Sequence, residues 1–152
     1  MIRDIIVTDD GTEVSDRAIE VAIEIAKPCN AHLTLLHVID HIEDPDSMIF
    51  KNNRELIEQA RMMSIGRATE NGWSKRAKEK IKQIHDQKIT ANIECLTGPP
   101  AEKILGFADA KKADMIVMGS SNRLRGISKI KALGSVTRKV SELANCPVLI
   151  VH

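Results

Sequence analysis

The feature that most constrains the fold of this chain is a set of short apolar runs rich in β-branched residues. Four of them stand out, at residues 5–8, 32–39, 115–118 and 147–151. A fifth run, residues 89–96, is more mixed and is expected to form an outer strand. Runs that are apolar throughout, rather than alternating with polar residues, are typical of strands covered on both faces, as in a parallel sheet. The sequence therefore predicts a parallel β-sheet.

Segments with helical periodicity separate these runs. In the first segment, Ser15 or Asp16 is expected to cap the start of the helix. Pro99 and Pro100 open the next clear helical segment, and proline is favoured in the first turn of a helix. The charged segment 53–87 has enough apolar residues for one helical face. The predicted inward-facing residues are Ala18, Val21, Ala22 and Ile25; Ile57, Met62, Ile65, Ala77, Ile81 and Ile84; Ile104, Leu105 and Ala108; and Val136, Val140, Leu143 and Ala144.

The alternation of strands and helices limits the possible topologies. Parallel neighbours are joined by crossovers that are almost always right-handed, so helices must cover both faces of the sheet. We therefore predict an α/β fold, a doubly wound three-layer sandwich with a five-stranded parallel sheet. The expected arrangement is Rossmann-like, with the strand order 3-2-1-4-5. With 152 residues, the chain is expected to form a single domain spanning residues 1–152.

Composition narrows the class of partner. Lys and Arg number 22 against 21 Asp and Glu, a net charge of +1, so no general attraction to nucleic acid is expected. Two Phe, one Trp and no Tyr leave few side chains on which bases could stack. No apolar stretch approaches the roughly 18 residues of a membrane span. Cys29, Cys95 and Cys146 are odd in number and widely separated, which argues against a disulfide framework or zinc site and favours the cytoplasm.

The residues that follow the predicted strands carry the functional signal, because ligands of doubly wound sheets bind beyond the carboxyl ends of the strands. Thr8 to Thr12 follow the first run, and Asp-Gly within them is also a common turn sequence. Gly119 follows the fourth run and would let a ligand approach the backbone. Gly134 and Ser135 precede the last helix, whose free amides would attract an anion. The GxGxxG and Walker patterns are absent, so these residues indicate a phosphate site without specifying one.

Six stretches together identify a family. They are Ile5-Ile-Val-Thr-Asp-Asp-Gly-Thr12, Leu35-Leu-His-Val-Ile-Asp40, Gly98-Pro-Pro-Ala-Glu-Lys-Ile104, Ala113-Asp-Met-Ile-Val-Met-Gly-Ser120, Gly134-Ser-Val-Thr137 and Cys146-Pro-Val-Leu-Ile-Val151. In this order they resemble the universal stress protein family over essentially the whole chain. The resemblance implies the fold of adenine nucleotide alpha hydrolase-like proteins and a nucleotide-binding branch of the family.

Nucleotide-binding members of that family carry a loop of the form G-x2-G-x9-G-[S/T], which holds the ribose and phosphates of ATP. The resemblance implies that Asp10 lies near the nucleoside and that Thr8, Asp9 and Val38 offer backbone groups around adenine. The remaining implied nucleotide-binding residues are Met118, Gly119, Ser121 and Asn122 at the start of the loop and Gly134, Ser135, Val136 and Thr137 at its end.

The loop departs from the family pattern in two ways. Asn122 takes the place of the second glycine, and eleven residues rather than nine separate it from Gly134. Asparagine tolerates a left-handed backbone better than most residues, so the turn itself is compatible with the change. The basic residues in and just after the loop, Arg123, Arg125, Lys129, Lys131 and Arg138, are candidates either for phosphate contacts or for a solvated surface.

The resulting expectation is a cytoplasmic stress-response regulator that binds ATP or AMP, with or without Mg²⁺. The apolar final strand, residues 147–151, lies at the sheet edge in this topology, and pairing with a second copy would cover it. A homodimer through this strand and a signalling partner of unknown identity are therefore expected. No membrane, nucleic acid, catalytic residue or metal site made by the protein alone is expected.

Other functions fit parts of this sequence. The closest alternative is a dimeric interaction protein of the same fold that binds no nucleotide. Asp9-Asp10 also fits the acidic pair of response-regulator receiver domains, but those domains need a phospho-accepting aspartate where this chain has Gly119. His37 lies inside an apolar run and is expected to be structural, and no Ser-His-Asp spacing is evident. At most slow ATP turnover is expected.

Overall fold

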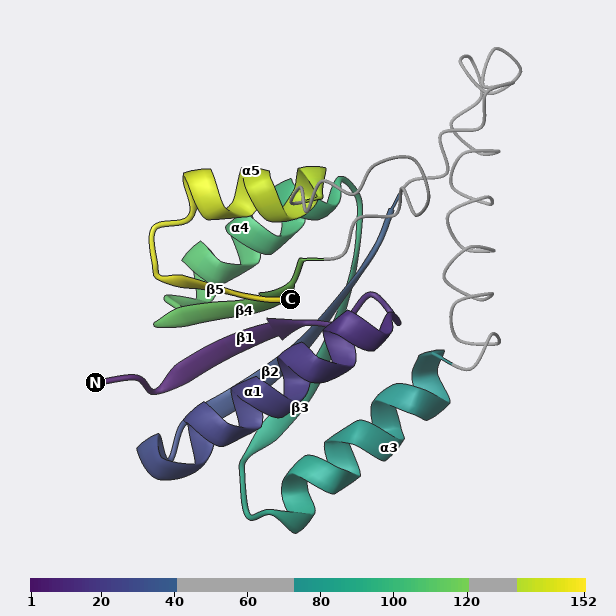
Figure 1. Ribbon diagram of the computed structural model, residues 1–152, viewed down its shortest axis with the longest axis vertical. Coiled ribbons are helices and arrows are strands. Elements are labelled where there is room, and N and C mark those ends of the chain that lie inside the picture. Colours follow the sequence, from purple (N-terminus) through teal and green to yellow (C-terminus); the bar gives the residue numbers. More distant parts are fainter. Residues whose placement is uncertain (41–72, 121–133) are drawn as a thin grey trace.

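A computed structural model describes residues 1–40, 73–120 and 134–152. Strands and helices alternate along these residues, and every strand is separated from the next by at least one helix (Figure 1). The elements are β1 (Asp4–Thr8), α1 (Glu13–Cys29), β2 (His32–Ile39), α3 (Trp73–Asp86), β3 (Ala91–Thr97), α4 (Pro100–Lys111), β4 (Met115–Gly119), α5 (Ser135–Leu143) and β5 (Val148–Val151).

The strands form one five-stranded sheet with the order β3-β2-β1-β4-β5. All four neighbouring pairs are parallel, with Ile5 opposite Leu33 on one side of β1 and opposite Met115 on the other. The predicted topology is therefore confirmed. Because the chain winds one way from β1 to β2 and β3 and the other way to β4 and β5, the winding direction reverses between β1 and β4.

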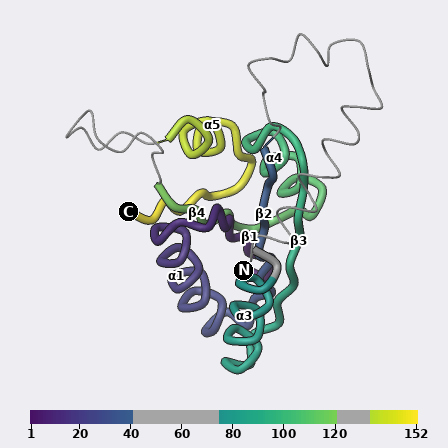
Figure 2. The backbone as a smooth tube through the Cα atoms, turned by 90° about the vertical axis from the view of Figure 1, so that its right-hand side faces the viewer, coloured from purple at the N-terminus to yellow at the C-terminus, as the bar shows by residue number. Residues whose placement is uncertain are grey.

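Helices cover both faces of the sheet, as Figure 2 shows from the side. Consecutive strand residues point to opposite faces, so each strand supplies both layers. Val7 packs with α1 and α3 on one face, whereas Ile6 packs with α4 and α5 on the other. Each such side chain is fully or almost fully buried, which stabilises the fold by about 1.5–3 kcal/mol relative to leaving it exposed.

The N-cap of α1 lies three residues before Ser15 and four before Asp16, the two predicted caps. Thr12 is the N-cap, and its hydroxyl accepts a hydrogen bond from the Ser15 amide at 3.2 Å. Of the predicted inward residues, Ala18 and Ala22 are fully buried, whereas Val21 and Ile25 are only partly buried. The buried face also includes residues that were not predicted, namely Ser15, Ile19 and Ala26. Small side chains dominate it because α1 packs closely against the sheet.

In the other helices the predicted inward residues that the structure describes are buried or partly buried, with one exception. In α3, Ala77 and Ile84 are both 1% exposed, while the predicted residues 57, 62 and 65 lie outside the described part of the chain. Pro100 opens α4 as expected. Leu143, predicted to face inward, is 57% exposed because α5 ends at this residue and Val140 is the last buried position of the helix.

Candidate functional site

The predicted site residues that the structure describes gather at the carboxyl ends of β1 and β4, where the winding direction reverses. Val38 and Met118 pack on the face covered by α4 and α5, and Thr8 has the same parity as Ile6 on that face. The turn from Asp9 to Thr12 leaves the end of β1. Ser121 and Asn122 lie outside the described residues, so the structure places both ends of the predicted loop but not its middle.

The N-terminus of α5 supplies the end of the predicted phosphate loop. Gly134 is the N-cap and has no side chain with which to bond the amides of the first turn. Those amides have no partners within the helix, and the helix dipole places partial positive charge among them. Ser135 is exposed and Val136 half-buried beside them. The arrangement suits an anion.

Thr137 fastens this helix to the sheet. It is 3% exposed, and its hydroxyl donates a hydrogen bond to the carbonyl oxygen of Gly119, 3.1 Å away. The bond joins the first turn of α5 to the last residue of β4. The hydroxyl proton is thus committed to the protein, while the oxygen keeps lone pairs with which to accept a bond.

Gly119 has a packing role that the sequence did not reveal. A Cβ atom at this position would lie 2.9 Å from Cγ1 of Val14 and 3.2 Å from the Val14 carbonyl carbon. No real Cβ comes so close without a shift of its neighbours. Glycine therefore lets the first turn of α1 approach the end of β4, whether or not a ligand also contacts this backbone.

Asp10 shapes the turn after β1. Its Oδ1 accepts hydrogen bonds from the Thr12 amide at 3.0 Å and from the Thr12 hydroxyl at 2.6 Å. Gly11 between them has φ +82°, a left-handed backbone conformation that glycine adopts without strain. Asp10 itself is exposed, so its carboxylate is accessible to a ligand while it stabilises the turn.

Asp9, in the same turn, faces α3 and has a role that the sequence did not reveal. Asp9 is 2% exposed. Its Oδ1 accepts hydrogen bonds from the Gly11 amide and from the Ser15 hydroxyl, both at 3.0 Å. Arg76 Nη2 lies 3.3 Å from the same oxygen, and Lys80 Nζ lies 4.0 Å from Oδ2. Both cations come from α3.

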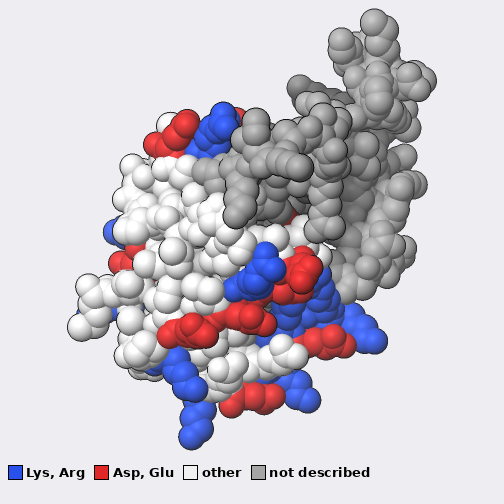
Figure 3. Space-filling model, in the orientation of Figure 1, with Lys and Arg blue, Asp and Glu red and all other residues white. Residues whose placement is uncertain are grey.

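These contacts belong to a larger charged cluster, which we call the Asp9 cluster: Asp9, Ser15, Asp16, Arg76 and Lys80. Arg76 also donates to the carbonyl oxygen of Gly11 at 2.7 Å and forms an ion pair with Asp16, as does Lys80. Burial lowers the pKa of the Lys80 ammonium, and the negative charge of Asp9 partly opposes that shift. In Figure 3, acidic and basic side chains lie next to one another over the face formed by α1 and α3.

His37 holds the backbone of the same turn. Its Nδ1 lies 2.7 Å from the carbonyl oxygen of Asp9, so Nδ1 carries the proton and donates it in this bond. This contact gives His37 a structural task at the end of β2. Within the described residues, no group of three or more His, Cys, Asp or Glu side chains is arranged to hold a metal ion.

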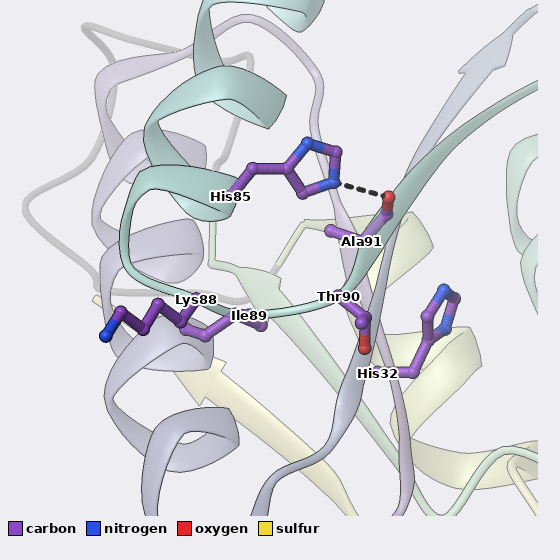
Figure 4. A pocket seen from close by; sticks show the side chains of 6 residues that line it. All are labelled: His32, His85, Lys88, Ile89, Thr90 and Ala91. Carbon is purple, nitrogen blue, oxygen red and sulfur yellow. Dashed lines mark hydrogen bonds between the residues drawn. The ribbon is translucent and has the colours of Figure 1, made fainter.

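A separate depression lies at the opposite end of the sheet. A depression of about 400 Å³ is lined by His32, His85, Lys88, Ile89, Thr90 and Ala91 (Figure 4). His85 Nε2 bonds the Ala91 carbonyl oxygen at 3.0 Å there. This depression lies at the amino ends of β2 and β3, whereas ligands of doubly wound sheets bind at the carboxyl ends. Within the part of the chain that the structure describes, no helix is both long and apolar enough to cross a membrane.

Comparison with known proteins places this geometry in a family. The model of the universal stress protein family matches residues 1–152. A universal stress protein of Methanocaldococcus jannaschii, MJ0531, is 34% identical over 152 residues, covering 99% of this chain and 82% of its own length. The universal stress protein YxiE of Bacillus subtilis is 34% identical over 165 residues, covering all of both chains.

Solved structures share the fold. The universal stress protein UspA from Lactobacillus plantarum superposes with a TM-score of 0.79 at 21% identity, covering 99% of this chain and 97% of that one. A universal stress protein in complex with cAMP gives 0.61 at 22% identity, covering 99% and 97%. The protein from Archaeoglobus fulgidus in complex with dAMP gives 0.58 at 19% identity, covering 100% and 98%. At these identities the likeness concerns the fold alone.

Proposed function

The chain belongs to the universal stress protein family, and we propose on this premise that it is a regulatory protein that binds ATP or AMP between the carboxyl ends of β1 and β4. The observation that carries the proposal is the meeting of two features at the point of winding reversal. One is the exposed Asp10 turn, and the other is the first turn of α5, opened by Gly134. Proteins of the same fold bound to cAMP and dAMP support an adenine nucleotide as the ligand class.

Each part of the site suits a different part of the ligand. The amides at the start of α5 suit phosphate oxygens, and one helix N-terminus contributes about 0.3–1 kcal/mol to such an interaction. The carboxylate of Asp10 suits ribose hydroxyls, since a carboxylate is an acceptor. Backbone groups near Val38, which is half-buried, suit the base. Met118 is buried at the end of β4, where the phosphate loop begins. A Mg²⁺ ion would be held chiefly by the phosphates and water, because Mg²⁺ often binds in this way.

A homodimer is part of the proposal. The last strand, β5, lies at one edge of the sheet, and all four of its residues are only partly buried within the chain. An edge strand of this kind is normally covered, bent or charged, and pairing with β5 of a second copy around a two-fold axis would cover it. Cys29, Cys95 and Cys146 are unpaired, which fits a reducing cytoplasm as the place where the dimer and its signalling partner act.

A second candidate function is favoured by specific contacts. Asp10 bonds Thr12, Gly119 accommodates Val14, and Thr137 bonds Gly119, so each of these residues has a task without a ligand. A dimeric interaction protein that binds no nucleotide would keep all three contacts. The two functions differ in a single measurable property, the affinity for nucleotide.

Calorimetric titration with ATP and with AMP, each with and without Mg²⁺, tests the proposal. Asp10→Ala should weaken binding by about tenfold, the cost of losing hydrogen bonds to a charged group. Gly134→Val should abolish binding, since a branched side chain would block the approach of phosphate to the backbone. Gly106→Ala is the control, because nothing lies within 4 Å of a Cβ there. No heat with any nucleotide would leave the interaction protein as the function.

A further inference from the structure

The Asp9 cluster joins two parts of the chain that the sheet topology alone does not connect. Arg76 lies on α3, 67 residues from Asp9 and 65 from Gly11, and contacts both. In the proposed nucleotide site, the turn after β1 presents Asp10. We propose that Arg76, on α3, is a positioning residue that holds this turn in its ligand-binding conformation. The inference rests on the proposed function.

The contacts converge on the one residue of the turn whose backbone is left-handed. Gly11 has φ +82°, its amide donates to Asp9 Oδ1 at 3.0 Å, and its carbonyl oxygen accepts from Arg76 Nη1 at 2.7 Å. Both backbone polar groups of Gly11 are therefore bonded within or to the cluster. Asp10 directly precedes this residue, so a change in the orientation of Gly11 would move the Asp10 carboxylate.

Arg76 is suited to this task by its shape. Its planar guanidinium reaches three acceptors, namely the Gly11 carbonyl oxygen and the carboxylates of Asp9 and Asp16. A lysine ammonium is a compact charge on a flexible stem and does not present such a fixed fork. The contact thus fixes an orientation as well as neutralising a charge.

Stability alone gives a weak reason for this arrangement. The Asp9 side chain is fully buried, and removing a carboxylate from water offsets much of what its ion pairs contribute. Among the described residues, Asp9 Oδ2 and Arg76 Nε have no hydrogen-bond partner, so the cluster does not maximise its bonding. What it does achieve is a fixed geometry for the turn, and that geometry matters where a ligand binds.

The test compares Arg76→Met and Arg76→Lys with Lys78→Met, an exposed position on the same helix. Titration with ATP and with AMP should show binding weakened by about tenfold in Arg76→Met, the scale of a lost charged hydrogen bond. Arg76→Lys should restore less than half of that loss, and Lys78→Met should change affinity by less than about twofold. Parent-like affinity in Arg76→Met, or full restoration by lysine, would overturn the inference.

Hydrogen exchange separates this inference from the proposed function. The Gly11 amide should exchange about tenfold faster in Arg76→Met, while the Ala113 amide, bonded to the Ala108 carbonyl at the opposite end of the sheet, should be unchanged. Should the parent bind no nucleotide, the proposed function fails and the exchange rates still report whether Arg76 holds the turn. Unchanged exchange at Gly11 would contradict the inference in either case. If Arg76→Met does not fold, Arg76→Lys supplies the same comparison.

Discussion

At the carboxyl ends of β1 and β4, the side next to α3 and the side next to α5 are built in opposite ways. On the α3 side, Asp9 is buried among hydrogen-bond donors and two cations. On the α5 side, the N-cap of the helix is Gly134, which provides no side-chain cap for the main-chain amides of the first turn. The first side fixes a backbone conformation through many contacts, and the second offers groups to a ligand. A protein can thus place rigidity and binding capacity on opposite sides of one turn.

The largest effect is expected where the α3 side is broken. Asp9→Ala removes the carboxylate that Arg76 and Lys80 surround, leaving two partly buried cations for which Asp16 is the one remaining acidic partner among the described residues. Breaking a buried ion pair from one side costs about 3 kcal/mol. Urea unfolding should show this loss in the free energy of unfolding. A loss below about 1 kcal/mol would mean that the α3 side is no more rigid than the α5 side.

Gly119→Ala tests the boundary between the two sides. The new methyl group would lie 2.9 Å from Val14 Cγ1 and 3.2 Å from the Val14 carbonyl carbon, so α1 must shift. Overpacking of this kind lowers the free energy of unfolding by about 2 kcal/mol. Gly106→Ala, within α4 and with open space around it, should instead stabilise by about 0.5–1 kcal/mol. Equal effects of the two changes in thermal unfolding would rule out close packing as the reason for Gly119.

Thr137→Val measures the cohesion of the α5 side. It removes the 3.1 Å hydrogen bond to the Gly119 carbonyl oxygen and leaves that buried oxygen without this donor. The expected loss in the free energy of unfolding is about 1 kcal/mol. Ser141→Ala, which removes an exposed bond to the Arg138 carbonyl on the same helix, is the control and should cost less. If both variants cost the same, Thr137 does not anchor α5.

The smallest effect is expected from the titration of Lys80. Its pKa in the folded protein lies below the ordinary value of 10.5, chiefly because of burial. As pH rises through the folded pKa toward that value, the unfolded chain holds more protons than the folded one, so the free energy of unfolding rises. This rise, measured by urea unfolding across the alkaline range, should be smaller in Lys80→Met than in the parent. An identical slope would show that the ammonium is as well solvated in the folded protein as in the unfolded one.

Local patterns in the sequence determined the architecture. The apolar runs predicted the strands and their parallel arrangement, because a continuous run of β-branched residues is typical of strands whose two faces are both covered. The same patterns predicted the Thr8 to Thr12 turn and the start of α5 near Gly134. Their errors were also local, as at Leu143, since periodicity does not specify the residue at which a helix leaves the core.

Only the tertiary structure decided what the polar residues at the site do. Asp9 and Asp10 are adjacent and identical in the sequence, yet one is buried beneath α3 and the other is exposed on the turn. The difference follows from the opposite directions of consecutive side chains and from the register of α3, which brings Arg76 across 67 residues of sequence to Asp9. The packing role of Gly119 likewise depends on the position of α1 against β4 in the folded protein. Such contacts depend on how elements far apart in the sequence pack together, and a local sequence pattern does not specify that packing.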